Sequence, residues 1–324
     1  MKAIVCKEYG PPDRLVVEEI PSIDAAPGEV VVAVKAASVN FPDTLIIQNK
    51  YQVKPPLPFS PGSEMAGVVK AVGAGVAGLR PGARVMALTG YGAFAEEVAV
   101  PAAHAMAIPE GMDFPVAASL LLAYGTSVHA LADRGQLRAG ERLLILGAAG
   151  GVGTAAIEIG KALGAFVIAC ASSDEKLALC REEGADALIN YAKTDLRDGI
   201  KAITGGDGVD VVYDAVGGSY TEPALRSLAW RGRLLVVGFA AGDIPKIPLN
   251  LTLLKGCSIV GVNIGGFTTR EPAGFAATVA RLGRWYAEGR IRPRVTETMP
   301  LERAPEALAR MAARQVKGKI VLLT

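Results

Sequence analysis

Cysteine and histidine are scarce in this chain, and their scarcity removes several classes of protein. The 324 residues include four cysteines and two histidines. No two cysteines form a C-x-x-C pair, so neither a disulfide framework nor a four-cysteine zinc site can be assembled locally. We expect each cysteine to be a small, buried apolar residue.

Long apolar runs and blocks of like charge are also missing. No apolar run reaches the 18 residues that suggest a transmembrane helix, and the N-terminal apolar stretch is too short for a secretory signal. The net charge is +2, without the basic stripe that binds nucleic acid. We therefore expect a soluble cytoplasmic protein whose partners are small molecules or copies of itself.

What the chain does contain is a glycine-rich turn between a predicted strand and a predicted helix. The apolar residues 143–146 lead into the run GAAGGVG at 147–153, and an alanine-rich segment follows to residue 163. A helix N-terminus carries unpaired N–H groups and partial positive charge, and glycines let a pyrophosphate approach them. Ala148 replaces the usual first glycine of the dinucleotide fingerprint, and such turns also occur for geometric reasons alone.

The end of the next predicted strand bears on the choice of cofactor. Ser172 and Ser173 follow that strand, about 20 residues beyond the glycine turn. An NAD site places a carboxylate there, whereas an NADP site has small polar residues and a cation for the 2'-phosphate. Lys176 lies one helical turn further, so the sequence favours NADPH. Asp174 and Glu175 keep NAD open, and Ser173 or Asp174 could simply cap the helix.

The pattern of apolar residues changes about one third of the way along the chain. Before Pro109, short alternating runs broken by Gly and Pro indicate a β-rich domain. A helix is expected at 115–132, and a helix at 305–314 lies between strands at 292–299 and 319–323. Between residues 132 and 292, six further strands are predicted, at 143–146, 166–170, 187–190, 209–213, 234–237 and 258–262. Their helical spacers indicate an α/β fold with a doubly wound parallel sheet.

Four motifs are distinctive when taken together. They are SVNFPD at 38–43, PLPFSPGSEMAG at 56–67, AAGGVG at 148–153 and GVDVVYD at 208–214. They resemble the medium-chain dehydrogenase/reductases, and within them the zinc-independent NADPH:quinone oxidoreductase branch, also called the zeta-crystallin group. The resemblance covers essentially the whole chain. It implies a GroES-like catalytic domain at 1–123, a Rossmann domain for NADPH at 124–265, and a segment at 266–324 that completes the catalytic domain.

The residues that bind catalytic zinc in other members of this family are replaced here. The motif that resembles their C-x-x-D begins with Asn40, and their Gly-His-Glu reads GSE at 62–64. A catalytic zinc needs three protein ligands, and only Glu64 remains. His104 and His129 lie in segments where a structural role is expected. We therefore expect no metal.

Without a metal to polarise a carbonyl, a conjugated acceptor is the easier substrate. Hydride addition to a quinone or an enone spreads charge onto oxygen, so hydrogen bonds and a weak acid can suffice. By resemblance to the enoyl thioester reductases, Tyr51 is a candidate proton donor; aromatic packing is its alternative. Asn40 is a candidate for orienting the acceptor or the nicotinamide, or else a turn residue. Leu45 stands where the quinone reductases often have tyrosine, which weakens the case for a quinone.

The glycine turn, the strand ends and the resemblance together give a set of cofactor-binding residues. The members near the phosphates and the nicotinamide are Tyr124, Thr126, Ala149, Gly150, Gly151, Val152, Gly238, Phe239, Val262 and Asn263. Those near the 2'-phosphate are Ser172, Ser173, Lys176, Tyr191 and Arg314. Tyr191 could equally be a surface aromatic, Arg314 a cation at a helix end and Gly238 an ordinary turn residue.

These expectations combine into a two-domain, zinc-independent oxidoreductase that transfers hydride from NADPH to a quinone or an activated alkene. A 2-enoyl thioester reductase is one alternative, and an NADPH-binding structural or regulatory protein with little turnover is another. The sixth strand, 258–262, would leave an apolar sheet edge exposed. We therefore expect a homodimer that pairs through this strand.

Overall fold

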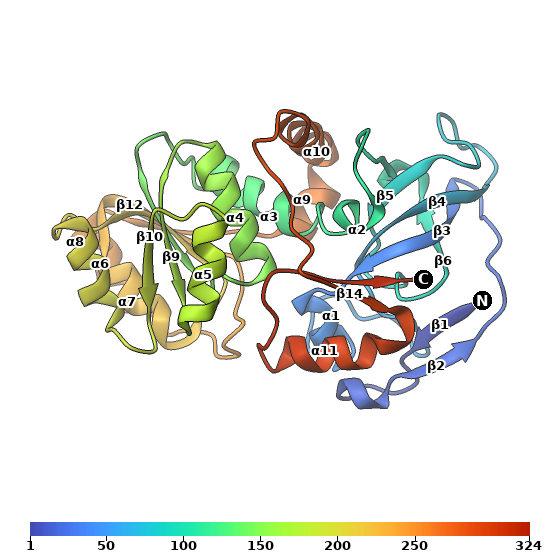
Figure 1. Cartoon of the computed structure of the whole chain (residues 1–324), viewed down its shortest axis with the longest axis horizontal. Coiled ribbons are helices and arrows are strands. Elements are labelled where there is room, and N and C mark those ends of the chain that lie inside the picture. The colour runs from blue at the N-terminus through green and yellow to red at the C-terminus, as the bar shows by residue number, and fades with distance from the viewer. The chain divides into compact units, whose positions relative to one another are not determined.

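The computed structural model describes residues 1–324, which form two units joined by two chain crossings. The first unit contains Met1–Leu122 and Pro293–Thr324, and the second contains Ala123–Arg292 (Figure 1). The first boundary adjoins the predicted one. The second lies later than the predicted residue 266, because the segment after 266 packs inside the second unit: the Phe267 ring stacks on His129 with centroids 4.0 Å apart.

A seven-stranded sheet organises the first unit. Its order is β14-β15-β3-β4-β5-β7, with β6 also paired to β3. These strands are β3 (Glu29–Ser38), β4 (Glu64–Val72), β5 (Arg84–Leu88), β6 (Glu97–Pro101), β7 (Met106–Ala107), β14 (Glu297–Pro300) and β15 (Ile320–Leu323). Because β15 pairs with β3, the C-terminal segment completes this sheet. The unit also holds the hairpin of β1 (Lys2–Val5) and β2 (Val16–Glu19), and the helices α1 (Phe41–Ile46), α2 (Phe114–Ala117) and α11 (Ala304–Ala312).

The second unit is built on a six-stranded parallel sheet in the order β10-β9-β8-β11-β12-β13. The strands are β8 (Arg142–Leu146), β9 (Phe166–Ala171), β10 (Ala187–Asn190), β11 (Val209–Asp214), β12 (Leu228–Val236) and β13 (Ser258–Gly261). All six predicted strands are present. In chain order this is 3-2-1-4-5-6, so the predicted doubly wound sheet is confirmed.

Helices connect the parallel strands, as such a sheet requires. They are α4 (Gly151–Ala162), α5 (Asp174–Glu182), α6 (Leu196–Thr204), α7 (Thr221–Arg226) and α8 (Asn250–Lys255), with α3 (Ala123–Val128), α9 (Ile264–Arg270) and α10 (Pro272–Ala287) outside the strand series. Asp214, at the end of β11, fixes the loop that follows: its Oδ1 accepts from the N–H groups of Val216 and Gly217, and its Oδ2 from the Thr221 hydroxyl.

Two sequence predictions need correction. The helix expected at 115–132 is divided into α2, a turn, α3 and a π-helix at His129–Arg134, because the first chain crossing falls within it. The strand expected at 292–299 shrinks to β14, since Pro293 cannot donate a ladder hydrogen bond. The four cysteines are buried and free, as predicted. None of the helices is both long and apolar enough to cross a membrane.

Candidate functional site

The glycine turn after β8 is shaped by close backbone packing. Gly147 has a φ of +70°, and Gly150 caps the N-terminus of α4. A Cβ atom at Gly153 would lie 2.5 Å from the carbonyl oxygen of Gly147 and 2.6 Å from that of Ala148, so only glycine fits there. The turn therefore places the N-terminus of a twelve-residue helix directly at the carboxyl end of β8.

The other strand ends predicted to bind cofactor lie on the same edge of the sheet. Because all strand pairs are parallel, residues that follow the strands share the edge with the glycine turn. This group contains Ala149, Gly150, Gly151 and Val152 after β8, Ser172 and Ser173 after β9, Tyr191 after β10, Gly238 and Phe239 after β12, and Val262 and Asn263 after β13. The fold thus brings eleven of the predicted residues to one edge.

Hydrogen bonds at the end of β9 show which side chains are already engaged. The Ser173 Oγ accepts from the Lys176 N–H at 3.3 Å, so Ser173 does cap α5. The Asp174 carboxylate accepts from the Asn190 amide at 2.6 Å and from the Lys193 ammonium at 2.5 Å. The hydrogen bond from Lys193 holds the pKa of Asp174 below its usual range. Asp174 is thus already partnered by a cation.

Two predicted residues lie on α3, where their side chains are buried. Thr126 is 6% exposed, and the Tyr124 hydroxyl donates to the Glu158 Oε2 of α4 at 2.5 Å. Burial, and next the neighbouring Glu158 charge, raise the pKa of Tyr124. The hydroxyl of Tyr124 is therefore occupied within the second unit.

A buried charged cluster surrounds Asn40 in the first unit. The Asn40 amide donates to the Ser38 carbonyl at 3.1 Å and to the Glu64 Oε2 at 3.3 Å. Its Oδ1 accepts from the Lys319 ammonium at 2.6 Å, and that ammonium lies 3.7 Å from the Glu64 Oε2. The Asp43 Oδ2 accepts from the Asn40 backbone N–H at 2.8 Å and helps to start α1. Both donors of the Asn40 amide are thus used.

Burial dominates the electrostatics of this cluster. It raises the pKa of Asp43 to about 7 and raises that of Glu64, whereas it lowers the pKa of Lys319. Burial outweighs the groups that favour the ionised form of Asp43, which are the Asn40 N–H, the Ser63 hydroxyl and the Lys319 charge. One ammonium therefore shares a water-poor site with two carboxyl groups that are hard to ionise.

Tyr51 and Arg314 belong to the first unit as well. Tyr51 lies after α1, half-buried against the core of this unit, and burial, then the Asp43 charge, raise its pKa. Arg314 follows α11 with a φ of +57°. It lies in a different unit from Lys176 and Tyr191, the other residues predicted around the 2'-phosphate.

The sequence interpretation missed Lys319 and Glu158. Lys319 directly precedes the apolar strand β15, and a charge at the start of such a run is a weak signal of a buried partner. Glu158 lies on α4 among apolar residues, and nothing in the sequence pairs it with Tyr124. Both pairings join residues far apart in the chain.

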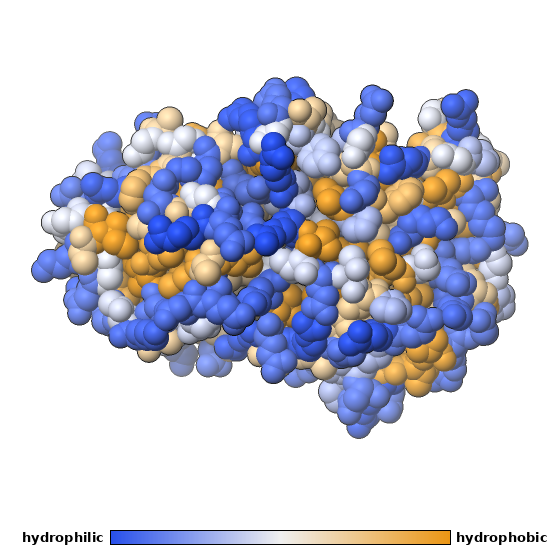
Figure 2. Space-filling model, viewed as in Figure 1, coloured by the Kyte–Doolittle hydropathy of each residue, from blue (hydrophilic) through white to orange (hydrophobic).

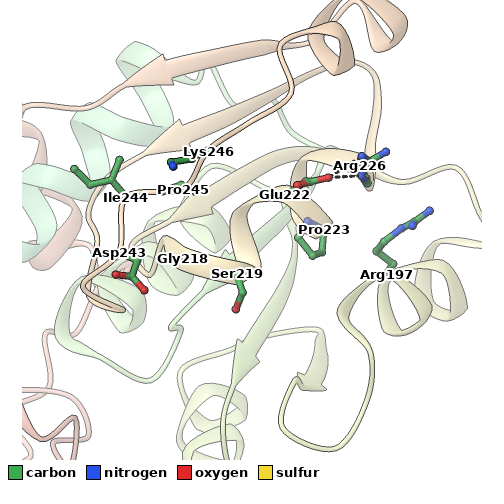
Figure 3. Close-up of a pocket in the computed structure, with 10 residues that line it drawn as sticks. All are labelled: Arg197, Gly218, Ser219, Glu222, Pro223, Arg226, Asp243, Ile244, Pro245 and Lys246. Atoms are coloured by element: carbon green, nitrogen blue, oxygen red, sulfur yellow. Dashed lines mark hydrogen bonds and ion pairs between the residues drawn. The ribbon is translucent and has the colours of Figure 1, made fainter.

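A surface pocket of about 760 Å³ lies in the second unit between α6, α7 and the loop after β12 (Figure 3). Arg197, Arg226, Lys246, Glu222 and Asp243 supply its charges, and Arg226 is paired with Glu222. None of the residues predicted to bind cofactor or substrate lines it.

The raised pKa of Asp43 predicts a pH-dependent stability difference between the wild type and Asp43→Asn. Between pH 5 and 6.5 the unfolded chain is ionised at this position while the folded chain keeps the proton, so stability is lost as pH rises. The wild type should lose up to about 1.4 kcal/mol per pH unit relative to the variant. Urea unfolding at pH 5, 6 and 7 measures this; a difference that stays constant would contradict the raised pKa.

Comparison with known proteins identifies the family. Residues 26–110 match the family described as "Alcohol dehydrogenase GroES-like domain", and residues 151–281 match "Zinc-binding dehydrogenase". The rat quinone oxidoreductase-like protein 2 is 37% identical over 322 residues, which cover 99% of this chain and 91% of the rat protein.

Solved structures agree in fold over the full length. A probable oxidoreductase from Mycobacterium abscessus is 40% identical with a TM-score of 0.91, and the match covers 100% of this chain and 99% of that one. Escherichia coli quinone oxidoreductase, complexed with NADPH, is 31% identical with a TM-score of 0.93 and full coverage of both chains. The predicted resemblance is confirmed: the chain belongs to the medium-chain dehydrogenase/reductase family, among its quinone oxidoreductase-like members.

Proposed function

We propose that this protein is an NADPH-dependent oxidoreductase that reduces a quinone or another activated alkene without zinc. The observation that carries the proposal is the glycine turn, where Gly153 allows α4 to begin directly at the carboxyl end of β8. Such a helix start is an anion site. The NADPH-bound relative from Escherichia coli, similar over the full chain, supports the same cofactor here.

The residues around the turn fit NADPH. Residues 149–152 would receive the pyrophosphate, and Ser172, Ser173 and Lys176 would receive the 2'-phosphate, with Tyr191 and Arg314 as further candidates. In this proposal Tyr124 and Thr126 support the site from within the protein, since both side chains are buried. Gly238, Phe239, Val262 and Asn263 would border the nicotinamide end. NADPH supplies the hydride when it is bound.

The residues at the positions of the zinc ligands do not fit a catalytic zinc. Asn40 and Ser63 offer no thiolate or imidazole, and Glu64 is paired with Lys319. A cation placed there would have to displace an ammonium that is 2.6 Å from the Asn40 Oδ1. Charge repulsion and the missing soft ligands both oppose metal binding.

In this proposal Tyr51 donates the proton. Asn40 has fewer free hydrogen-bonding groups than the sequence suggested. With both amide donors used inside the cluster, Asn40 offers only the remaining lone pair of Oδ1, which can accept from a donor such as the nicotinamide carboxamide but cannot bind the carbonyl oxygen of a substrate. Tyr51 is half-buried and its phenol is protonated at neutral pH, while burial, which raises its pKa, makes it a weaker acid than an exposed tyrosine.

The assignment of Lys176 predicts a cofactor-specific effect of Lys176→Ala. Removing a charge-assisted contact to phosphate should weaken NADPH binding about tenfold or more and leave NADH binding nearly unchanged. Fluorescence titration with both cofactors measures the ratio. Lys161→Ala is the matched control, because Lys161 lies in the last turn of α4 and is bound to Asp186. Equal losses for the two cofactors would contradict the assignment.

The assignment of Tyr51 predicts the effect of Tyr51→Phe. Loss of a general acid should lower kcat by about 10²- to 10⁴-fold with an enoyl thioester, and less with a quinone, because solvent can protonate a hydroquinone anion. Steady-state kinetics with both acceptors also separates the two substrate classes.

Two controls accompany this experiment. Tyr9→Phe removes the hydroxyl of another first-unit tyrosine, which donates to the Pro55 carbonyl at 2.9 Å. Prolonged chelation should leave wild-type activity intact. Full turnover of Tyr51→Phe with every active acceptor would make Tyr51 a packing residue, and activity lost on chelation and restored by zinc would overturn the metal-free mechanism.

We also propose a homodimer that pairs through β13. This strand ends the six-stranded sheet and is mostly exposed. Large exposed apolar side chains cluster on β12, β13, α8 and the loop before α8; they are Trp230, Ile244, Leu249, Leu253, Leu254 and Ile259. Figure 2 shows apolar surface at the α8 end of this unit. Exposed apolar edges are rare in monomers.

A charge on this strand should prevent dimer formation. Light scattering at micromolar concentration should give twice the chain mass of 33.5 kDa for the wild type and the single mass for Ile259→Lys. Val17→Lys, on the exposed strand β2, should remain dimeric. A wild-type monomer would rule out the proposal.

A further inference from the structure

One carboxylate of the second unit holds groups beside both chain crossings. The chain passes between the units after Leu122 and after Arg292. The Glu158 Oε2 accepts from the Tyr124 hydroxyl at 2.5 Å, and its Oε1 accepts from the Arg292 backbone N–H at 2.9 Å. Tyr124 is two residues past the first crossing, and Arg292 is the last residue before the second. All three residues belong to the second unit.

Glu158 is carried by the same helix that begins at the glycine turn. It lies on α4, and α3 contacts α4 a second time near the turn, where the Ser127 Oγ is 3.2 Å from the Val152 carbonyl oxygen. Tyr124 and Ser127 both lie on α3, which starts at the first crossing. Glu158 therefore ties the third turn of α4 to the segment that enters this unit, and the Ser127 hydroxyl, which is also 2.9 Å from the Ala123 carbonyl oxygen, contacts the first turn.

In the first unit, a glutamate likewise accepts a hydrogen bond from the residue at the first crossing. The Leu122 N–H donates to the Glu64 Oε1 at 2.8 Å, and Glu64 belongs to the buried cluster with Asn40 and Lys319. Residues on either side of this crossing are thus bound to a glutamate of their own unit. A hydrogen bond to a carboxylate is about twice as strong as one between neutral groups, and each of these bonds lies within a single unit.

We propose that Glu158 is a positioning residue that couples the glycine turn to both chain crossings, so that occupation of the turn by NADPH is transmitted to Arg292. The inference rests on the NADPH binding proposed above. If NADPH binds more tightly when the Glu158 ties are formed, linkage requires that bound NADPH stabilise those ties in turn. Local opening at Arg292 then becomes less frequent when the cofactor is bound.

The chemistry of the two partners gives a selective pair of variants. Glu158→Met keeps the chain length but cannot accept either hydrogen bond. Glu158→Gln can keep both, because its amide oxygen accepts from the Arg292 N–H and its amide nitrogen donates to the Tyr124 oxygen. A role that depended on charge alone would be lost in both variants, whereas the tie proposed here survives in Glu158→Gln.

Residue-resolved hydrogen exchange on the full chain, with and without NADPH, tests the proposal. Without cofactor, the Arg292 amide should exchange about tenfold or more faster in Glu158→Met than in the wild type, and nearly normally in Glu158→Gln. NADPH should slow exchange at Arg292 in the wild type and in Glu158→Gln, but not in Glu158→Met. The Leu122 amide, held by Glu64, should exchange equally in all three.

Controls separate this tie from general loosening and from failure of the proposed function. Glu222→Met breaks an exposed ion pair with Arg226 in the same unit and should leave Arg292 unchanged. If Glu158→Met does not fold, Tyr124→Phe takes its place. This variant removes one of the two hydrogen bonds to Glu158 and should at least halve the slowing of Arg292 exchange by NADPH.

Each remaining outcome has a definite consequence. Unchanged Arg292 exchange in Glu158→Met would overturn the tie, and equal NADPH protection there would overturn the coupling. If the wild type does not bind NADPH in a titration, the proposed function and the coupling fail together, while the cofactor-free exchange rates still decide whether Glu158 holds Arg292.

Discussion

The parallel pairing of six strands is the constraint on which the candidate site depends. Parallel strands need crossover connections, and these bring every strand back to start at the same edge. The loops that follow β8, β9, β10, β12 and β13 are therefore neighbours although they are far apart in the chain. The glycine turn adds a close backbone approach, because the oxygen atoms of Gly147 and Ala148 leave no room for a side chain at residue 153.

The first unit holds charged side chains inside an apolar core. Asn40, Glu64 and Lys319 satisfy one another through hydrogen bonds and one ion pair, while Asp43 is bound to the Asn40 backbone. Removing one member would leave another unpaired in a low dielectric, which is more costly than the pair is stabilising. The cluster therefore fixes the orientation of the Asn40 amide, and it holds the Lys319 ammonium between Asn40 and Glu64.

Sequence reasoning was reliable where the signal was local and failed where partners came from distant segments. The six strands and the glycine turn were predictable because apolar runs and glycines act within a few residues. The helix expected at 115–132 was wrong, since a chain crossing interrupts apolar residues that have helical spacing. The second unit's end was placed too early because Phe267 belongs to an aromatic stack with His129, which no local pattern reveals. The roles assigned to Tyr51, Lys176 and the other site residues stay predictions.

The sequence by itself determined the fold class, through periodicity and glycine positions, and the family, through four motifs that resemble those of known members; it also predicted the edge of the sheet at which a dinucleotide would bind. Only the tertiary structure decided which polar side chains are already engaged. Lys319 reaches Asn40 across 279 positions of the chain, and Glu158 holds both Tyr124 and Arg292. Such pairings arise from the packing of distant elements, which forces buried polar groups to find partners wherever the fold supplies them.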